Sequence, residues 1–285
     1  MVFLSAGFHR TQPKIVPMII YLNGQFEEEE QASISAVDAG FLFGDGVFTT
    51  LRLYQGVAPD LKVHCSRLQE QAQTLGIPCN LTFEKTQGIL EELVEKNNLR
   101  HTDARMRITC SRGENPEGHS PTILATVLPL SPSFDEEIAR GICVVTLDHH
   151  YQRHNFPRIK SLNYLPAVMA LRLAREKGCE EAIVRDEKNH LTEGAVSNLF
   201  LVKDGNLLTP ADDGRILAGR TRRHIIQYAH DRNLNCSEKN LSLDQLKNSN
   251  EVFLCNSIRQ IVPVVQIDQE TVGDGKPGPL TLKIR

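Results

Sequence analysis

The apolar positions divide the first half of the chain into strand-like and helix-like stretches. Alternation of apolar and polar residues, or a short run of β-branched and aromatic residues, predicts a strand, whereas apolar residues three and four apart predict a helix. Two helices are expected, near Val63–Leu75 and Phe83–Asn97. The mixture predicts an α+β fold, with strands at Met18–Leu22, Val47–Tyr54, Ala104–Cys110 and Thr122–Leu128.

The second half shows a different set of stretches. Helices are expected at Leu165–Lys177, where Pro166 is tolerated in the first turn, and at Thr221–Arg232. Because the first of these helices begins shortly after Lys160, that lysine is expected just before a helix. The predicted strands are Ile142–Leu147, Glu181–Arg185, Asn198–Val202, Glu251–Leu254 and Ile261–Ile267.

An acidic connector marked by Pro132 separates the two halves and occupies residues 130–137. We therefore expect an N-terminal α+β domain at residues 18–129 and a C-terminal domain at residues 138–285. Residues 1–17 lack apolar periodicity and a basic leader, and we expect a disordered extension or an upstream-start artefact there. No apolar run is long enough to span a membrane.

The charge balance argues against nucleic acid and anionic membrane surfaces as partners. The 285 residues carry a net charge of −3, with scattered basic residues, so a small-molecule substrate is the default expectation. The seven cysteines are odd in number, widely spaced and never arranged as C-x-x-C. This pattern argues against a disulfide scaffold and a zinc module, and favours a reducing, cytoplasmic compartment.

The most informative chemistry lies around Lys160. Tyr164 follows four positions later, and Glu193 stands in what reads as a turn-rich segment further on. A lysine with such neighbours suits pyridoxal 5′-phosphate, with Lys160 forming the Schiff base. An isolated lysine is ordinarily a solvated surface charge. The sequence blocks around Lys160 and Glu193 favour a cofactor-binding lysine over a surface lysine.

Those blocks resemble the class IV, or fold type IV, pyridoxal-phosphate enzymes, which include branched-chain and D-amino acid aminotransferases and 4-amino-4-deoxychorismate lyase. The resemblance implies a smaller N-terminal α/β domain and a larger, β-rich C-terminal domain with helices. It also implies a homodimer with each active site near the domain boundary and the subunit interface. The matching blocks are residues 21–24, 43–48, 67–68, 160, 193–198, 217–222 and 251–264.

By this resemblance, Lys160 is both the Schiff-base residue and the proton shuttle. Its pKa must then be lowered by desolvation or by a neighbouring positive charge, for which Arg158 is a candidate. Glu193 would face the pyridine nitrogen, and Tyr164 would lie by the phenolic oxygen and the imine. Read without the family, Glu193 would be a surface turn residue and Tyr164 a half-buried aromatic at a helix start.

The resemblance also supplies donors for the cofactor phosphate. Arg67 would make a charge-assisted contact, although an exposed helical arginine is its plainer reading. Arg220 and Thr221 precede a predicted helix, whose N-terminal N–H groups suit a dianion, although a simple turn and N-cap would fit too. Ser257 would add a hydroxyl or backbone donor, and Leu217 would lie against the cofactor ring.

Three features favour the lyase among the family's activities. The run Asn256-Ser257-Ile258-Arg259 resembles an Asn-Ser-Leu-Arg run of aminodeoxychorismate lyases. Thr50 stands where branched-chain aminotransferases carry a glycine. Glu117 stands where D-amino acid aminotransferases carry a carboxylate-binding arginine, and a glutamate would repel that carboxylate.

The leading hypothesis is therefore a lyase of folate biosynthesis that converts 4-amino-4-deoxychorismate to 4-aminobenzoate and pyruvate. An aminotransferase of amino acids, of the branched-chain or D-amino acid type, is the alternative, and a non-catalytic binding protein is a second one. Phe48, Thr50 and Arg107 are candidate substrate contacts, together with Arg105, although alternating arginines also suit one face of a strand.

Two other clusters favour no further partner. His149, His150 and His154 match no known metal-ligand spacing, so no metal is expected. The basic run Arg220–His224 could suggest nucleic acid, but binding of the cofactor phosphate explains it better in a chain with an acidic balance.

Overall fold

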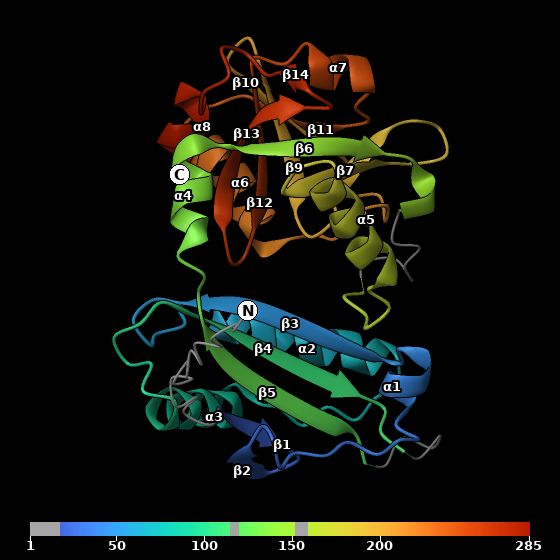
Figure 1. Cartoon of the computed structure of the whole chain (residues 1–285), viewed down its shortest axis with the longest axis vertical. Coiled ribbons are helices and arrows are strands. Elements are labelled where there is room, and N and C mark those ends of the chain that lie inside the picture. The colour runs from blue at the N-terminus through green and yellow to red at the C-terminus, as the bar shows by residue number, and fades with distance from the viewer. Residues whose placement is uncertain (1–17, 115–119, 152–158) are drawn as a thin grey trace, which may run out of the picture.

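Two β-sheets with helices packed on them make up the structure, a computed structural model that describes residues 18–114, 120–151 and 159–285 (Figure 1). A five-stranded sheet comes from the first half of the chain and a nine-stranded sheet from the second half. In the view of Figure 1 the five-stranded sheet lies below, with β3 nearest to the upper sheet. This arrangement is the α+β fold that the sequence predicts.

The five-stranded sheet is antiparallel, with the order β2-β1-β5-β4-β3. Alternation places Leu51 and Met106 on the face that packs against the helices, while Thr50 and Arg107 are paired on the opposite face. Its elements are β1 (Ile19–Leu22), β2 (Gln25–Glu28), α1 (Ala39–Phe43), β3 (Gly46–Leu53), α2 (Leu61–Thr74), α3 (Phe83–Lys96), β4 (Ala104–Ser111) and β5 (Thr122–Pro129).

The nine-stranded sheet is mixed, because β6 pairs parallel with both β13 and β7 whereas β9 pairs antiparallel with β10 and β12. Its order is β11-β10-β9-β12-β13-β6-β7-β8, with β14 beside β13. Its strands are β6 (Ile142–Leu147), β7 (Glu181–Arg185), β8 (Leu191–Gly194), β9 (Asn198–Lys203), β10 (Asn206–Pro210), β11 (Cys236–Lys239), β12 (Glu251–Asn256), β13 (Gln260–Ile267) and β14 (Glu270–Thr271).

Helices cover this sheet on different sides and bury separate apolar clusters. The cluster around Phe200 and Phe253, whose rings stack with centroids 5.0 Å apart, packs against α6 and α8. A second cluster joins β6 and β7 to α5. The helices are η1 (His149–Tyr151), α5 (Leu165–Glu176), α6 (Arg220–Asp231), α7 (Leu243–Lys247) and α8 (Pro279–Ile284).

The predicted connector, residues 130–137, contains the start of helix α4 (Ser133–Arg140). Ile138 on this helix is buried in the core of the nine-stranded sheet. The passage between the two sheets is therefore anchored by an amphipathic helix, which the proline and the acidic residues alone did not reveal.

Each strand and helix expected above is present, with ends that differ by a few residues at most. The reading of the segment around Glu193 as turn-rich was wrong, because Leu191–Gly194 form strand β8. All four residues are buried, and Gly194 pairs with Ile183 of β7. Glutamate and glycine disfavour strands, so pairing with β7 decides the conformation of this end of β8.

The cysteine pattern misled us at one pair, because Cys143 of β6 and Cys179 before β7 form a disulfide. Parallel pairing of β6 with β7 brings the two residues together although they lie 36 positions apart. The other cysteines, Cys65, Cys79, Cys110, Cys236 and Cys255, are free. None of the helices in the described part of the chain is long and apolar enough to cross a bilayer.

Candidate active site

A cavity of about 550 Å³ lies between the two sheets and gathers every site residue predicted from the sequence. The five-stranded sheet and α2 supply one wall, and the loops around β8, α6 and β12 supply the other. The predicted residues that line it are Phe48, Thr50, Arg67, Arg107, Lys160, Tyr164, Glu193, Leu217, Arg220, Thr221 and Ser257.

Lys160 is held at this boundary by the backbone of β3. Its carbonyl accepts a hydrogen bond from the Phe48 amide at 3.0 Å, and its own amide donates to Oε1 of Gln71 at 3.1 Å. The bridge between Val47 and Ser161 extends this pairing. Because β3 is the edge strand of its sheet, its free side fixes the lysine segment ahead of α5.

Aromatic rings surround the Lys160 side chain. Its Nζ lies 4.6 Å from the centroid of the Phe48 ring and 5.4 Å from that of Tyr164. The two rings contact each other edge to face, with centroids 5.2 Å apart. The guanidinium of Arg107 also lies 3.7 Å from the Phe48 centroid, and burial lowers the pKa of Arg107. Phe48 therefore contacts two cations and helps to orient both of them.

Glu193 provides a buried negative charge on the opposite wall. Its Oε2 accepts hydrogen bonds from the Leu217 amide at 3.0 Å and from Nδ2 of Asn198 at 3.4 Å. The same Asn198 nitrogen donates to the Leu217 carbonyl at 2.8 Å. These contacts fix the carboxylate relative to the loop that leads into α6, and a fixed carboxylate suits a protonated ring nitrogen. Asn198 was part of a matched block, but its role was not predicted.

The N-terminus of α6 opens into the cavity beside that loop. Gly219 is the N-cap residue, and no side chain in the described part of the chain caps the helix. A Cβ at Gly219 would lie 2.0 Å from Oδ1 of Asn198, so this approach requires glycine. The first N–H groups of the helix, at Arg220 and Thr221, therefore suit a bound anion such as phosphate.

Arg67, with its partners Thr49 and His64, forms the last part of the site, which we call the cationic floor. Nη2 of Arg67 donates to Oγ1 of Thr49 at 3.0 Å, and that oxygen lies 2.7 Å from Nδ1 of His64. Burial, followed by the charges of Arg67, Lys160 and Arg220, lowers the pKa of His64 to about 3. Burial and the charge of Arg223 lower the pKa of Arg67 to about 10. These two lowered pKa values indicate that positive charges are concentrated in a buried part of the site, where they would stabilise a dianion.

His64 was not predicted as part of the site. Its place one helical turn before Arg67 was the available signal, because residues three apart share a helix face. Two residues that informed the sequence predictions, Arg158 and Glu117, lie outside the described residues, as does His154.

The run Asn256–Arg259 has a structural role that its resemblance to lyases did not suggest. Oδ1 of Asn256 accepts hydrogen bonds from the amides of Ile258 and Arg259, each at 2.9 Å. The Arg259 side chain is buried and pairs with Glu181 and Glu137. Both residues line the cavity, but these contacts give the asparagine and the arginine structural roles that need no particular substrate.

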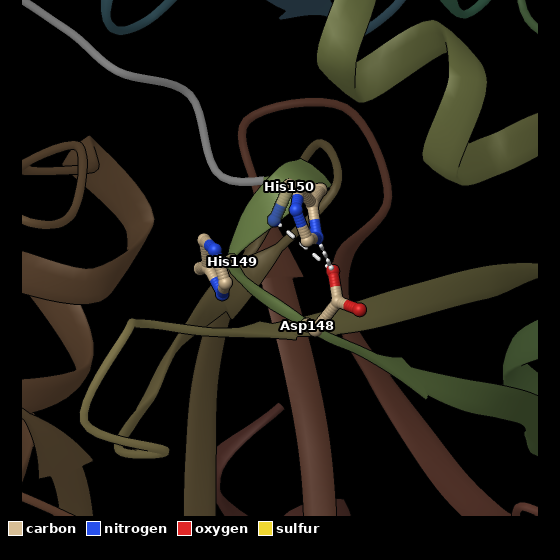
Figure 2. Close-up of side chains that lie close together, drawn as sticks. All are labelled: Asp148, His149 and His150. Atoms are coloured by element: carbon tan, nitrogen blue, oxygen red, sulfur yellow. Dashed lines mark hydrogen bonds and ion pairs between the residues drawn. The ribbon is translucent and has the colours of Figure 1, made fainter.

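Asp148, His149 and His150 form a small exposed cluster away from this cavity (Figure 2). Their candidate ligand atoms lie within 4.8 Å of one another. The Asp148 carboxylate is bonded to Nδ1 of His150 at 2.9 Å, and the two imidazole rings are 4.2 Å apart. Nothing beyond this proximity points to a metal ion.

Residues 46–267 match the family model of class IV aminotransferases. The chain belongs to that family. It is 37% identical over 274 residues to a Methanocaldococcus jannaschii protein provisionally named a branched-chain-amino-acid aminotransferase, covering 94% of each chain. It is 33% identical over 275 residues to the D-alanine aminotransferase of Bacillus licheniformis, covering 94% of this chain and 95% of the relative.

A solved structure agrees with this assignment. The branched-chain amino acid aminotransferase of Escherichia coli superposes with a TM-score of 0.86 at 28% identity, covering 94% of this chain and 92% of that one. The fold is therefore fold type IV, and the cofactor of the family is pyridoxal phosphate. The uncapped α6 N-terminus, the cationic floor and the buried Glu193 are chemically suited to that cofactor.

Proposed function

We propose that the protein is an aminotransferase that moves an amino group between an amino acid and a 2-oxo acid. The observation that carries the proposal is the position of Lys160, in one cavity with a buried carboxylate on one wall and an uncapped helix N-terminus beside it. The names of the relatives support transamination rather than the lyase reaction. This reverses the ranking that Thr50, Glu117 and the Asn256–Arg259 run suggested.

Each residue expected to contact the cofactor has one role in transamination. Bound pyridoxal phosphate supplies an electron sink for negative charge at the substrate carbon. Glu193 keeps a negative charge next to the ring nitrogen, and Leu217 packs on the ring. Arg67, Arg220, Thr221 and Ser257 bind the phosphate through side-chain and helix N-terminal donors, which the cavity lining supports.

Lys160 would hold the cofactor through Nζ. When the substrate amine takes that place, the same Nζ would be free to carry a proton from the substrate carbon to the neighbouring cofactor carbon. Tyr164 and Phe48 limit where Nζ can lie, because their rings flank it at 5.4 and 4.6 Å. A base confined to this small volume can serve both carbons.

The face of the five-stranded sheet suits an acidic substrate. Arg107 is paired across the strands with Thr50, and both line the cavity together with Arg105 and Arg175. Arginine binds a carboxylate with charge-assisted, bidentate hydrogen bonds. We infer that Arg107 receives a substrate carboxylate, with Phe48 and Thr50 shaping the adjacent wall.

The lyase is a second candidate, supported by Thr50 at the cavity wall in place of the glycine expected of branched-chain aminotransferases. The two activities differ in what happens to the cofactor. A lyase returns it unchanged, whereas transamination of a single amino donor leaves the amine form until an oxo acid arrives.

That difference supplies the experiment. The holoenzyme is mixed with one amino donor at a time, including the L and D forms of alanine and of branched-chain amino acids, and oxo acid and cofactor absorbance are measured. We expect one equivalent of oxo acid per site and conversion to the amine form. Release of pyruvate from 4-amino-4-deoxychorismate over many turnovers, without amine-form build-up, would favour the lyase. Absence of both reactions would overturn both enzymatic proposals.

We also propose a homodimer, because a large apolar surface is exposed next to the cavity. Phe41 and Phe43 of α1 are 75% and 73% exposed, and Leu165 at the start of α5 is 68% exposed. The loop before α5 is bonded to the start of β3, since the Leu162 amide donates to the Gly46 carbonyl at 3.0 Å, and Cδ1 of Leu162 lies 3.2 Å from where a Cβ at Gly40 of α1 would stand. Such patches mark interfaces. Light scattering should give twice the monomer mass, and a monomeric mass would refute the dimer.

A further inference from the structure

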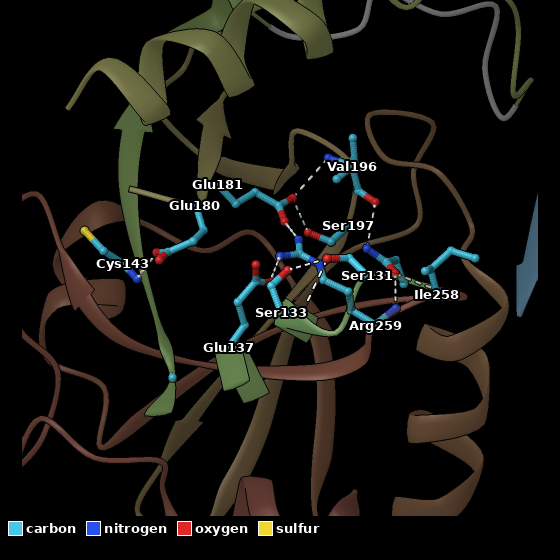
Figure 3. A network of polar contacts seen from close by, with 12 residues as sticks. Ser131, Ser133, Glu137, Cys143, Glu180, Glu181, Val196, Ser197, Ile258 and Arg259 are labelled. Atoms are coloured by element: carbon cyan, nitrogen blue, oxygen red, sulfur yellow. Dashed lines mark hydrogen bonds and ion pairs between the residues drawn. The ribbon is translucent and has the colours of Figure 1, made fainter. Parts of the chain in front are cut away.

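Arg259 occupies a buried position between two carboxylates (Figure 3). Its Nη2 donates to Oε2 of Glu181, and its Nη1 donates to Oε2 of Glu137 at 3.2 Å. Glu181 at the start of β7 is completely buried, and Glu137 comes from α4, which bridges the two sheets. Burial of these charges is costly, so the structure retains them in spite of a desolvation penalty.

The second oxygen of Glu181 reaches a different loop. Oε1 accepts hydrogen bonds from the Val196 amide at 3.1 Å and from the Ser197 hydroxyl at 2.5 Å. These two residues lie between Glu193 and Asn198, which are bonded to each other. Glu181 therefore links Arg259 to the turn that follows the proposed ring-nitrogen partner.

A parallel connection runs through Asn256. Its Oδ1 closes the 256–259 turn, and its Nδ2 donates to the Val196 carbonyl at 3.4 Å. Ser257, a proposed phosphate donor, lies inside this turn. The turn beside Glu193 and the turn that contains Ser257 are thus joined twice, once by the asparagine and once by the buried ion pair.

We propose that the Arg259–Glu181 pair is a positioning device, which fixes the distance between the Glu193 loop and the Ser257 turn. The cofactor must contact both loops at once, one through its ring nitrogen and one through its phosphate. Presetting their separation lowers the cost of ordering them when the cofactor binds. The inference rests on the proposed cofactor roles of Glu193 and Ser257.

If the pair acts by positioning, its removal should weaken cofactor binding while leaving the stability of the fold nearly unchanged. Replacement of Arg259 and Glu181 removes the brace and most of the desolvation penalty, because the remaining Glu137 is 15% exposed and can be hydrated, so the fold can survive the double change. Removal of one charge leaves the other buried and unpaired, which costs more. The double variant Arg259→Met with Glu181→Gln is therefore the critical one, and Arg259→Met alone is the second.

The experiment measures the Kd of the apoenzyme for pyridoxal phosphate and the thermal midpoint of apo and holo forms. We expect the double variant to bind the cofactor at least about tenfold more weakly, in the range of coupling between contacting residues, while its apo form melts within a few degrees of wild type. Arg259→Lys should recover part of the affinity, because a lysine can still pair with Glu181.

Glu251→Gln is the matched control. Glu251 is another buried carboxylate of the same sheet, and its Oε1 and Oε2 accept from the amides of Leu280 and Thr281 at 3.0 and 2.8 Å, holding α8. Its change should leave the cofactor Kd within about twofold of wild type, as expected for an independent site. A double variant with wild-type Kd, or an equal loss in the control, would overturn the positioning role. Failure of wild type itself to bind the cofactor would instead refute the proposed function.

Discussion

The two sides of the cavity differ in how firmly some of their polar side chains are held. On the nine-stranded side, Glu193 and Arg259 line the cavity and are buried, with Glu193 bonded to the Leu217 amide and Arg259 paired with Glu181 behind it. On the five-stranded side, Arg105 is exposed and Arg107 is half-buried on an open strand face. Buried, fully bonded groups hold one geometry, whereas long side chains on an open face can adapt. We call the nine-stranded side the upper wall and the five-stranded side the lower wall. We infer that the upper wall binds the cofactor, which stays the same, and that the lower wall binds the substrate, which can vary.

The division has an exception in Arg67 and His64, which come from α2 of the five-stranded half. His64 is buried and Arg67 half-buried beside β3, and both are bonded to Thr49, so they resemble the groups of the nine-stranded side. This exception agrees with the proposed phosphate-binding role of Arg67, because under that proposal the groups that bind the cofactor are the fixed ones on both sides of the cavity.

The largest expected effect concerns Lys160, which lies on the boundary between the walls. Lys160→Ala should lower kcat by at least about a thousandfold, because the proton carrier is lost. Pyridoxal phosphate should still bind through its phosphate, which equilibrium dialysis can measure. Lys62→Ala, an exposed lysine on α2, is the control and should behave as wild type. Retained turnover in Lys160→Ala would remove the lysine from the mechanism.

The next effect tests the upper wall. Glu193→Gln keeps the shape but removes the charge, and we expect kcat to fall about a hundredfold because developing charge loses a preorganised partner. The KM for the amino donor should change little. Exposed Glu187→Gln provides the control. A rise in KM at constant kcat would assign Glu193 to the substrate and break the comparison.

The lower wall is tested by Arg107→Met. If this arginine receives a substrate carboxylate, KM should rise about tenfold or more, the usual cost of a lost charged hydrogen bond. The Kd for pyridoxal phosphate should stay at its wild-type value. Arg100→Met, at an exposed position, serves as the reference. Weaker cofactor binding in Arg107→Met would mean that both walls hold the cofactor.

The smallest effect concerns the exception, His64. Its pKa is lowered to about 3, so the folded protein keeps it neutral while the unfolded chain takes up a proton below pH 6.5. Stability contributed by the neutral imidazole is therefore lost as pH falls, by about 1 kcal/mol between pH 6.5 and 5.5. Urea unfolding of wild type and His64→Gln measures it. An equal pH dependence in both proteins would contradict the buried neutral histidine.

Local pattern was sufficient for much of the fold. The alternation in β3 and β4 and the spacing in α2, α3 and α6 appear in the sequence because each element buries one face. Strand β8 was missed because Glu193 and Gly194 read as turn residues, and its conformation depends on β7. Helix α4 was missed because it is short and its apolar residues, Phe134, Ile138 and Ala139, lie among serine, acidic residues and a preceding proline.

The sequence by itself determined the family and named candidate cofactor residues, because Lys160, Glu193 and the segment before α6 stand in a characteristic order along the chain. Only the tertiary structure decided which groups hold those residues in place. Glu181 and Arg259 are separated by 78 positions, and Cys143 and Cys179 by 36, yet each pair is in contact. Such pairings depend on strand order and burial, and local pattern contains neither, so the brace around Glu193 became visible only in the folded chain.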